Sequence, residues 1–263
     1  MSPWWNKFFT QPCDVLITSE EIVFSQRAKV LATAEVPLGA ADETFEARIR
    51  RTLELVTTGV PQNTDRRINI WLSHSLVQYG VLGIDARAMN APDILTVLKA
   101  YWEDALDVPA ASLEITYQLQ PHGRSLFSSC CNSALVEAIK GAFAGGRWKI
   151  KRIAPDLAKT WNESRRQIRD DDYYLLIHQD KVLSIGLHED RQWTAWTSEG
   201  CESVDWAELS NRTIRFSRHT GLSDCQSIPV WIYAPKATVS PHSAGLTNWS
   251  LLNDVTPRLD AQF

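Results

Sequence analysis

Ser73, His74 and Ser75 follow an apolar stretch and are residue types that act as nucleophile and base in hydrolases. Their spacing does not suit that chemistry, because adjacent side chains cannot form the hydrogen bond between a nucleophile and its base. The surrounding residues also lack the G-x-S-x-G pattern. We interpret the triplet as the polar end of a strand, not as a catalytic centre.

Metal chemistry would need several ligands that converge on one ion. Asp170, Asp171 and Asp172 are consecutive, and side chains in a turn before a strand diverge, so a solvated loop is the better interpretation. The six histidines lack HxxxH spacing, and the five cysteines form no CxxC pair. The sequence therefore predicts no metal site and no cofactor, and reduced thiols at the cysteines Cys13, Cys130, Cys131, Cys201 and Cys225.

The most basic stretch begins at Arg147 and includes Trp148, a mixture found on surfaces that bind nucleic acid. Alternation places Lys149 and Lys151 on one face of a strand and Trp148 and Ile150 on the other, which is typical of an ordinary exposed strand. The net charge of −4 gives no general attraction to nucleic acid or to an anionic membrane. No apolar run of about 20 residues could span a bilayer, and the N-terminus lacks a secretory signal. We expect a cytoplasmic protein.

Hydrophobic periodicity predicts the elements that position these residues. Strands are expected as a meander over 14–38, at 67–72, 76–84, 112–120, 124–131 and 148–154, as a second meander over 173–198, and at 228–234. Helices are expected at 43–58 with Asp42 as its cap, 92–106, 133–144 capped by Asn132 or Ser133, 156–168 and, less regularly, 204–220.

A faint internal repeat divides these predicted elements into two copies. VLITSEEIV (Val15 to Val23) matches LLIHQDKVL (Leu175 to Leu183), and INIWL (Ile68 to Leu72) matches IPVWI (Ile228 to Ile232). Both matches lie 160 residues apart (15 to 175, 68 to 228). Each copy reads as a strand, a four-residue polar turn and a second strand, with a helical pattern before the last strand. The repeat predicts a duplicated α/β unit.

The order of elements resembles that of the actin/hexokinase/Hsp70 superfamily, and within it the PilM-type pilus-assembly proteins and the cytoplasmic domains of GspL-type secretion proteins. The similar passage runs from INIWLSHSLV through the inserted DILTVLKAYWEDAL and LEITYQLQ, then SLFSSCC, NSALVEAIKGAFAGG and WKIKRIAP. The resemblance covers residues 14–235 and implies an α/β, actin-like fold of two duplicated RNase H-like lobes. It implies a first lobe (14–160) with an inserted subdomain (about 76–120) and a second lobe (161–235). Composition adds an aromatic N-terminal segment (1–13) and a polar tail (236–263).

Superfamily members that bind ATP carry D-x-G in one strand-turn-strand loop of each lobe. The resemblance places the Asp positions on Leu16 and Leu176 and the Gly positions on Thr18 and His178. Leucine cannot hold Mg²⁺, and a Cβ at the glycine position crowds a phosphate oxygen. The two loops are therefore expected to be degenerate phosphate loops that bind no nucleotide.

The resemblance implies a non-catalytic scaffold of a type IV pilus or type II secretion machine. Such a protein would bind a short segment of an inner-membrane partner (PilN-like or GspM/GspL-like) and link it to the motor ATPase. It would lie in the cytoplasm, peripheral to the inner membrane through that partner. A homodimer is left open. The candidate partner-binding residues are an aromatic stripe at Trp4, Trp5, Phe8 and Phe9, which otherwise packs on its own lobe, and Leu98, Trp102, Ile115 and Tyr117 of the inserted subdomain.

Two alternatives remain at this point. The first is an active ATP-binding enzyme of the same superfamily, a kinase or a filament-forming ATPase, which the two loops argue against. The second is an unrelated α/β protein whose repeat is a coincidence.

Overall fold

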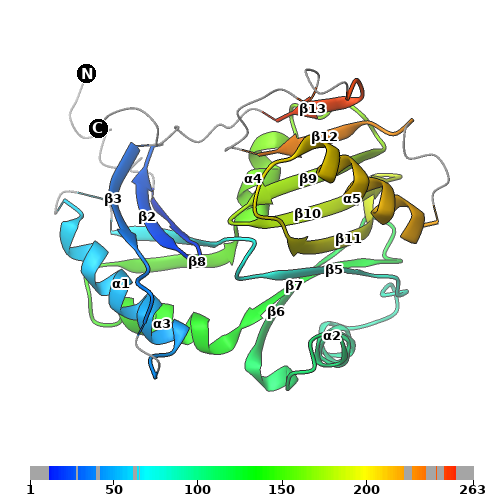
Figure 1. Cartoon of the computed structure of the whole chain (residues 1–263). Coiled ribbons are helices and arrows are strands. Elements are labelled where there is room, and N and C mark those ends of the chain that lie inside the picture. The colour runs from blue at the N-terminus through cyan, green and yellow to red at the C-terminus, as the bar shows by residue number, and fades with distance from the viewer. Residues whose placement is uncertain are drawn as a thin grey trace, which may run out of the picture. The chain divides into compact units, whose positions relative to one another are not determined.

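The computed structural model describes residues 12–27, 29–39, 42–61, 64, 66–221, 227–234, 241 and 246–252 (Figure 1). Two compact units account for these residues. Unit 1 holds the described parts of Met1–Leu76 together with Asn132–Lys159, and unit 2 holds Val77–Cys131 together with the described parts of Thr160–Val255. The aromatic stripe of the first nine residues lies outside the described chain.

Unit 1 is a five-stranded sheet in the order β3-β2-β1-β4-β8 with two helices on one face. The first three strands are antiparallel neighbours, whereas β4 runs parallel to both β1 and β8. The strands are β1 (Cys13–Ile17), β2 (Glu21–Gln26), β3 (Lys29–Glu35), β4 (Arg67–Leu72) and β8 (Lys149–Pro155), and the helices are α1 (Phe45–Gly59) and α3 (Ser133–Phe143). Helices α1 and α3 contact each other.

The helices of unit 1 begin where short polar side chains can accept a backbone hydrogen bond. Asn132, one of the two caps that the sequence offered, caps α3 by accepting from the backbone N–H of Ala134 at 2.9 Å. For α1 the cap is Thr44, which accepts from the N–H of Ala47, and not Asp42. The helix thus starts two residues later than expected, because the hydroxyl oxygen that accepts from the N–H of its first turn belongs to Thr44.

Unit 2 contains a second five-stranded sheet, in the order β11-β10-β9-β12-β13. This order and its strand directions repeat those of unit 1, which confirms the predicted duplication. The strands are β9 (Tyr173–Gln179), β10 (Val182–Glu189), β11 (Gln192–Gly200), β12 (Val230–Tyr233) and β13 (Trp249–Leu251), and α5 (Trp206–His219) packs on one face of the sheet. Helix α4 (Asp156–Ser164) begins in unit 1 and ends in unit 2.

Strand β13 lies in the range that the sequence assigned to a polar tail (236–263). It pairs in parallel with β12, and Trp249 is buried against Trp206 of α5 with the ring centroids 6.3 Å apart. The second lobe therefore extends to at least Leu252, whose backbone N–H donates to the carbonyl oxygen of Ile232. Three residues, of which Trp249 and Leu251 are apolar, are enough for this strand because the neighbouring sheet supplies the pairing.

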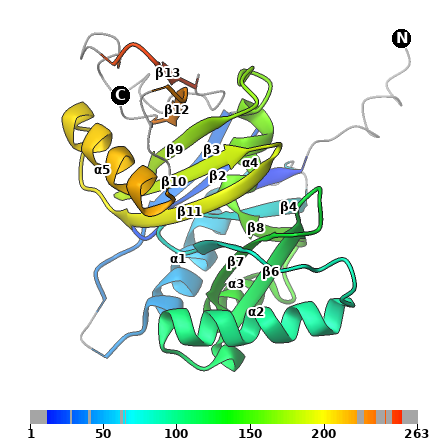
Figure 2. The same ribbon diagram turned by 90° about the vertical axis from the view of Figure 1, so that its right-hand side faces the viewer.

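The inserted subdomain is a three-stranded sheet in the order β5-β7-β6, with α2 across one face (Figure 2). Its core is formed by Leu82, Ile94, Leu98 and Leu126. The elements are β5 (Gln78–Leu82), α2 (Ala91–Leu106), the short 3-10 helix η2 (Ala110–Ser112), β6 (Leu113–Leu119) and β7 (Leu126–Asn132).

This subdomain belongs to the same compact unit as the second sheet, although the sequence assigned it to the first lobe. Aromatic rings explain the attachment. Trp196 of β11 lies 5.3 Å from Phe127 of β7 and 5.8 Å from Tyr79 of β5, measured between ring centroids. Gly186 allows this packing, because a Cβ there would overlap the Trp196 ring and lie 2.8 Å from the Trp193 ring. Side-chain packing, which sequence order does not reveal, fixes the subdomain to this sheet.

Candidate functional site

The first candidate phosphate loop lies between β1 and β2 and is closed on itself. The backbone N–H groups of Glu20 and Glu21 both donate to the Thr18 hydroxyl oxygen, at 3.1 and 2.8 Å. Thr18 in turn donates through its hydroxyl and its backbone N–H to the carbonyl oxygen of Glu21. Backbone N–H groups in such a turn are what a phosphate-binding loop offers to its ligand. Here a side chain of the loop itself already occupies two of them.

The carboxylate position of this loop is filled by Leu16, which is half-buried. Its neighbours on β1, Val15 and Ile17, are fully buried and face the helices, as the contact of Phe24 (opposite Val15) with Phe143 of α3 shows. Leu16 therefore points to the face without α1 and α3, where a metal-binding carboxylate would be needed. It offers only hydrocarbon there.

The second candidate loop is a tighter turn than the sequence predicted. Asp180 and Lys181 both have positive φ angles, 53° and 57°, and Gln179 pairs with Val182, so β9 and β10 are joined by a two-residue type I′ turn. His178 is buried and its Nε2 lies 2.8 Å from the carbonyl oxygen of Cys201. The four-residue polar turn expected from the repeat is therefore not formed here.

Strand pairing also shifts the correspondence between the two copies by one residue. Leu16 pairs with Trp71 in unit 1, whereas Trp231 pairs with Leu175 in unit 2. The two tryptophans are 160 residues apart, and the two leucines 159. Leu176 instead packs in the core under α5. The position equivalent to Leu16 is therefore Leu175, because a shift of one residue moves a side chain to the other face of a strand.

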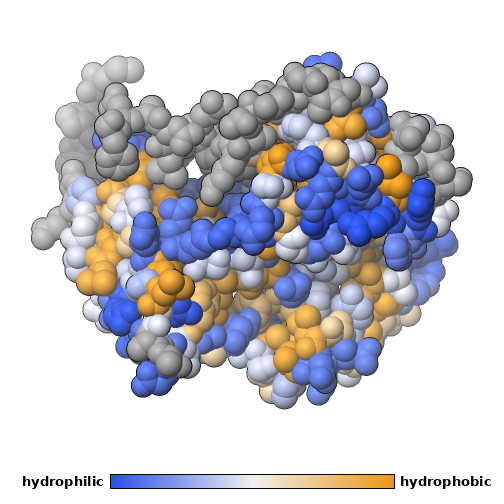
Figure 3. Space-filling model, viewed as in Figure 1, coloured by the Kyte–Doolittle hydropathy of each residue, from blue (hydrophilic) through white to orange (hydrophobic). Residues whose placement is uncertain are grey.

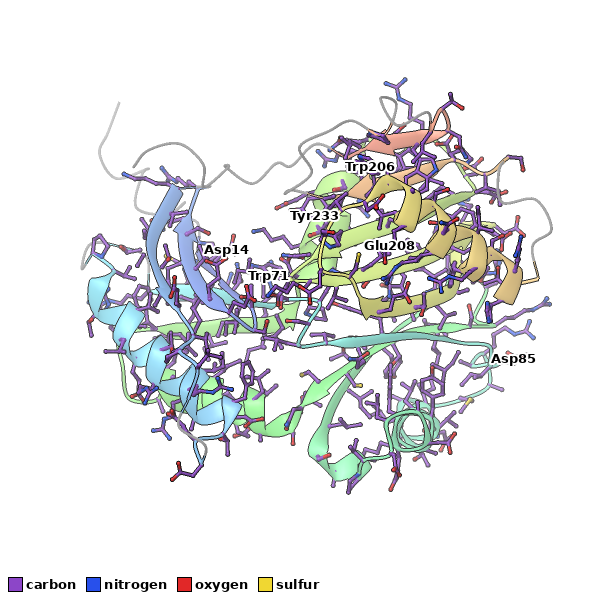
Figure 4. All side chains as sticks on the ribbon, viewed as in Figure 1. Asp14, Trp71, Asp85, Trp206, Glu208 and Tyr233 are labelled. Carbon is purple, nitrogen blue, oxygen red and sulfur yellow. The ribbon has the colours of Figure 1, made fainter. Side chains whose placement is uncertain are left out.

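Each of the two five-stranded sheets has a hydrogen bond between a tryptophan and an aspartate. The indole Nε1 of Trp71 donates to Asp14 Oδ1 at 2.9 Å (Figure 4), and Trp231 Nε1 donates to Asp170 Oδ2 at 2.8 Å. Asp14 also accepts from Asn69 Nδ2 at 3.0 Å, and Lys159 Nζ lies 4.0 Å from its second oxygen. These pairs are not predicted from the sequence, where their only signal is the tryptophan shared by the two matching strands.

The remaining polar candidates do not form a reactive centre. Asp170 is engaged by Trp231, whereas Asp172 accepts from the backbone N–H of Asp190, so the aspartates diverge as expected. Among the described residues no group of three or more His, Cys, Asp or Glu could hold a metal ion. The Ser73 and Ser75 hydroxyls lie 2.9 Å apart, and His74 between them is buried.

The two adjacent cysteines of β7 are held as neutral thiols. Burial raises the pKa of Cys130 to about 12, with Cys131 adding to the effect, and raises that of Cys131 to about 11, with Glu114 adding. A thiol reacts as the thiolate, so neither group is activated at neutral pH.

Two of the predicted partner-binding residues belong to the core of the subdomain. Leu98 is fully buried, and Trp102 is buried with its indole Nε1 donating to Ser128 Oγ at 2.9 Å. Ile115 and Tyr117 of β6 are half-buried and pack on the same core. Leu98 and Trp102 cannot meet a partner without opening this core, because the helical periodicity that singled them out is that of the buried face.

The exposed apolar side chains of the subdomain lie beside those residues. Val97 and Tyr101 project from α2, and Leu119 ends β6 with 45% of its surface exposed. Strand β6 is also the last strand of its sheet, so one of its edges has no strand partner among the described residues. An extended segment could pair with such an edge.

No protein-family model matches the chain, and no curated protein matches it. Solved structures do match. A chain of the PilM–PilN type IV pilus biogenesis complex aligns with a TM-score of 0.63 and 12% identity, over 92% of this chain and 88% of that one.

Two further structures support the same fold. A Bacteroides thetaiotaomicron protein with an actin-like ATPase fold and unknown function aligns with a TM-score of 0.57 and 9% identity, over 94% of this chain and 89% of that one. The cytoplasmic domain of EpsL, an inner-membrane component of the type II secretion system of Vibrio cholerae, gives 0.52 and 13%, over 87% and 84%. The chain therefore has the actin-like fold. No helix in its described part is long and apolar enough to cross a membrane.

Proposed function

We propose that this protein is a non-catalytic, actin-like scaffold of a type IV pilus or type II secretion machine. It lies in the cytoplasm against the inner membrane, binds a short segment of a membrane partner and links that partner to the motor ATPase. The fold shared with a chain of the PilM–PilN complex and with the EpsL cytoplasmic domain supports this assignment over other uses of the fold.

The closed loop between β1 and β2 carries the non-catalytic part of the proposal. A nucleotide would have to displace the Thr18 hydroxyl from two backbone N–H groups, and it would find Leu16 where magnesium needs a carboxylate. Exposed Glu20 adds repulsion toward phosphate. In unit 2 the two-residue turn at Asp180 and Lys181 offers no glycine to make room for a phosphate.

We propose that the partner segment binds the outer edge of β6. Backbone pairing would give affinity there, and Leu119 would give an apolar anchor. Half-buried Ile115 and Tyr117 hold this strand on the core of the subdomain. The proposed partner site therefore lies in the predicted region, but the two predicted residues that are buried would not contact the partner.

Calorimetric titration of the full chain with Mg-ATP tests the first part. We expect no binding at nucleotide concentrations up to about 1 mM, since the magnesium ligand and the free N–H groups are both missing. Saturable binding with a Kd below about 10 µM would contradict the proposal and favour an active ATP-binding enzyme.

Fluorescence anisotropy tests the second part, with labelled peptides that represent the short cytoplasmic segments of the host's pilus and secretion inner-membrane proteins. We expect one peptide to bind and Leu119→Asp to weaken it by about tenfold, the loss of one apolar anchor. Val97→Asp on α2 is the matched control and should leave binding unchanged. Binding that depends on Val97 and not on Leu119 would move the site to the helix, and binding of none of these peptides would contradict the proposed role.

A further inference from the structure

The guanidinium of Arg152 on β8 is fixed in place by two side chains of the neighbouring strand β4. Its Cζ lies 4.5 Å from the centroid of the Trp71 ring, and its Nε donates to Asn69 Oδ1 at 3.3 Å. Arg152 pairs with Asn69 in the sheet, and Trp71 follows two residues later on the same face. An exposed arginine normally samples many rotamers. Here a stacking contact and a hydrogen bond select one orientation.

The two side chains that orient Arg152 are themselves buried and are fixed by Asp14. Trp71 is 5% exposed and Asn69 6% exposed, and both donate to Asp14 Oδ1 (Figure 4). Because the Asn69 amide gives its N–H to Asp14, its Oδ1 is left to accept from Arg152. A buried polar side chain on an interior strand is uncommon, and orienting a charged group is a physical reason for one.

The duplication shows that the fold does not require this arrangement. Unit 2 has the hydrogen bond between Trp231 and Asp170. The residue two positions before Trp231 is Pro229, which has no amide side chain to take the place of Asn69. Strands β12 and β13 contain no arginine. The tryptophan–aspartate pair therefore serves the sheet in both copies, whereas the contact of Asn69 with Arg152 occurs in one copy and is not explained by the needs of the sheet.

The end of the guanidinium that carries Nη1 and Nη2 is open. In the part of the chain that the structure describes, the polar and ring contacts of Arg152 are those with Asn69 and Trp71, so this end has no partner. Asp14 is one acid beside two cations, because Lys159 Nζ also lies 4.0 Å from its Oδ2. Figure 3 shows mainly hydrophilic residues at the place where Figure 4 labels Asp14 and Trp71. The open end therefore favours an anion.

A carboxylate fits this open end better than a phosphate. The N–H groups of Nη1 and Nη2 lie in parallel in the guanidinium plane and match the two coplanar oxygens of a carboxylate. Phosphate sites usually add backbone N–H groups of a loop or a helix N-terminus, whereas Arg152, Asn69 and Trp71 lie within strands. One carboxylate also balances the single excess positive charge. We infer that Arg152 is a preformed receptor for a carboxylate, and that an aspartate or glutamate side chain of a partner protein occupies it.

The occupant is a protein side chain because one exposed arginine binds a free carboxylate weakly. A single charge-assisted pair of this kind corresponds to a Kd on the order of 10–100 mM. A protein segment adds contacts of its own, so the pair contributes specificity without supplying the whole affinity. Fixing the guanidinium beforehand reduces the entropy that is lost on binding. Arg152 belongs to unit 1 and β6 to unit 2, so this contact is additional to the one proposed at β6.

NMR titration of the 15N-labelled full chain tests the receptor through the indole N–H signal of Trp71, because the guanidinium stacks on that ring. The probes are sodium acetate and the blocked peptides acetyl-Ala-Glu-Ala-amide and acetyl-Ala-Gln-Ala-amide, at an ionic strength kept constant with sodium chloride. Acetate and the glutamate peptide should move the signal saturably, with a Kd on the order of 10–100 mM. The glutamine peptide should leave it unchanged.

Arg152→Lys keeps the charge but removes the two parallel N–H groups, and it should weaken both carboxylate probes by about tenfold. Lys149→Gln and Lys151→Gln are the matched controls, because each removes an exposed charge from the same strand. Both should keep the Kd within about twofold, since exposed charges contribute little. Asn69→Ala keeps Arg152 but releases its orientation, and it should weaken binding by about threefold. Unchanged backbone amide signals away from β4 and β8 show that each variant is folded.

The inference is overturned if sodium chloride alone moves the signal as acetate does. It is also overturned if Lys149→Gln or Lys151→Gln weakens binding as much as Arg152→Lys, because the effect then belongs to a general basic surface. Saturation by acetate without saturation by the glutamate peptide would exclude a protein side chain as the occupant. Inorganic phosphate that binds about tenfold more tightly than acetate would replace the carboxylate with a phosphate. None of these results bears on the scaffold role, which the partner-peptide assay at β6 tests separately.

Discussion

Asp14→Ala should destabilise unit 1, because this carboxylate is the acceptor for two donors on β4. Trp71 is 5% exposed and Asn69 6% exposed, and their side-chain N–H groups lie 2.9 and 3.0 Å from Asp14 Oδ1. A buried donor left without its acceptor costs about 1–3 kcal/mol. The Asp14 side chain is 33% exposed, so water can replace part of what is lost. The distant Lys159 pair adds little, about 0.5 kcal/mol or less. We expect a loss of about 2 kcal/mol in the free energy of unfolding.

Urea unfolding followed by far-ultraviolet circular dichroism measures this loss without relying on the fluorescence of Trp71. Asp85→Ala is the matched control, because Asp85 is also an aspartate in an ion pair, with Arg87, but its side chain is more exposed, at 55% (Figure 4). It should leave the midpoint unchanged, since exposed pairs contribute little.

A double-mutant cycle with Trp71→Phe isolates the hydrogen bond between the indole and the carboxylate, for which we expect a coupling of about 1 kcal/mol. If Asp14→Ala shifts the unfolding midpoint no more than Asp85→Ala, the Trp–Asp contact does not stabilise the sheet and the reasoning is wrong.

Three further outcomes follow from packing and ionisation. Gly186→Ala should cost about 1–3 kcal/mol in urea unfolding, because its Cβ would push Trp196 out of place; an unchanged midpoint would show that this ring is free to move. The pKa of His188 is lowered chiefly by burial, so the neutral ring is favoured in the folded state, and stability should be complete above about pH 6.5 and decline as the pH falls through the folded-state pKa. His188→Gln should remove most of that decline in the melting temperature, and an equal decline in the variant would assign it to other groups. With pKa values of about 12 and 11, Cys130 and Cys131 should resist alkylation in the native protein at pH 8 and react once it is unfolded; rapid native labelling by iodoacetamide, detected by mass spectrometry, would contradict their burial.

Local pattern predicts single elements well in this chain. The helix expected at 92–106 is observed at Ala91–Leu106, because Ile94, Leu98 and Trp102 recur at helical spacing and form its buried face. The same pattern also selected Leu98 and Trp102 as candidate partner-binding residues. Helical spacing shows only that residues share a face of the helix, and the face that bears these two is buried in the core of the subdomain.

The candidate phosphate loops show which parts of a functional prediction residue identity supports and which parts it does not. Leu16 and Thr18 were named from the sequence, but the sequence did not show that the Thr18 hydroxyl accepts from two backbone N–H groups of its own turn. In the second copy the constant offset pointed to Leu176, whereas pairing with Trp231 selects Leu175. The register of a strand is set by its neighbouring strands, so a constant offset between two sequence segments cannot determine which face of the sheet a side chain occupies.

The sequence by itself determined the duplicated order of strands and helices, since hydrophobic period, turn residues and the repeat are all local or nearly local properties. Tertiary structure alone decided that the subdomain joins the second sheet through Trp196 and that Trp249 extends that sheet. These outcomes depend on which side chains meet across long stretches of sequence. That choice is made by packing in three dimensions, where a single ring or glycine decides which surfaces fit together.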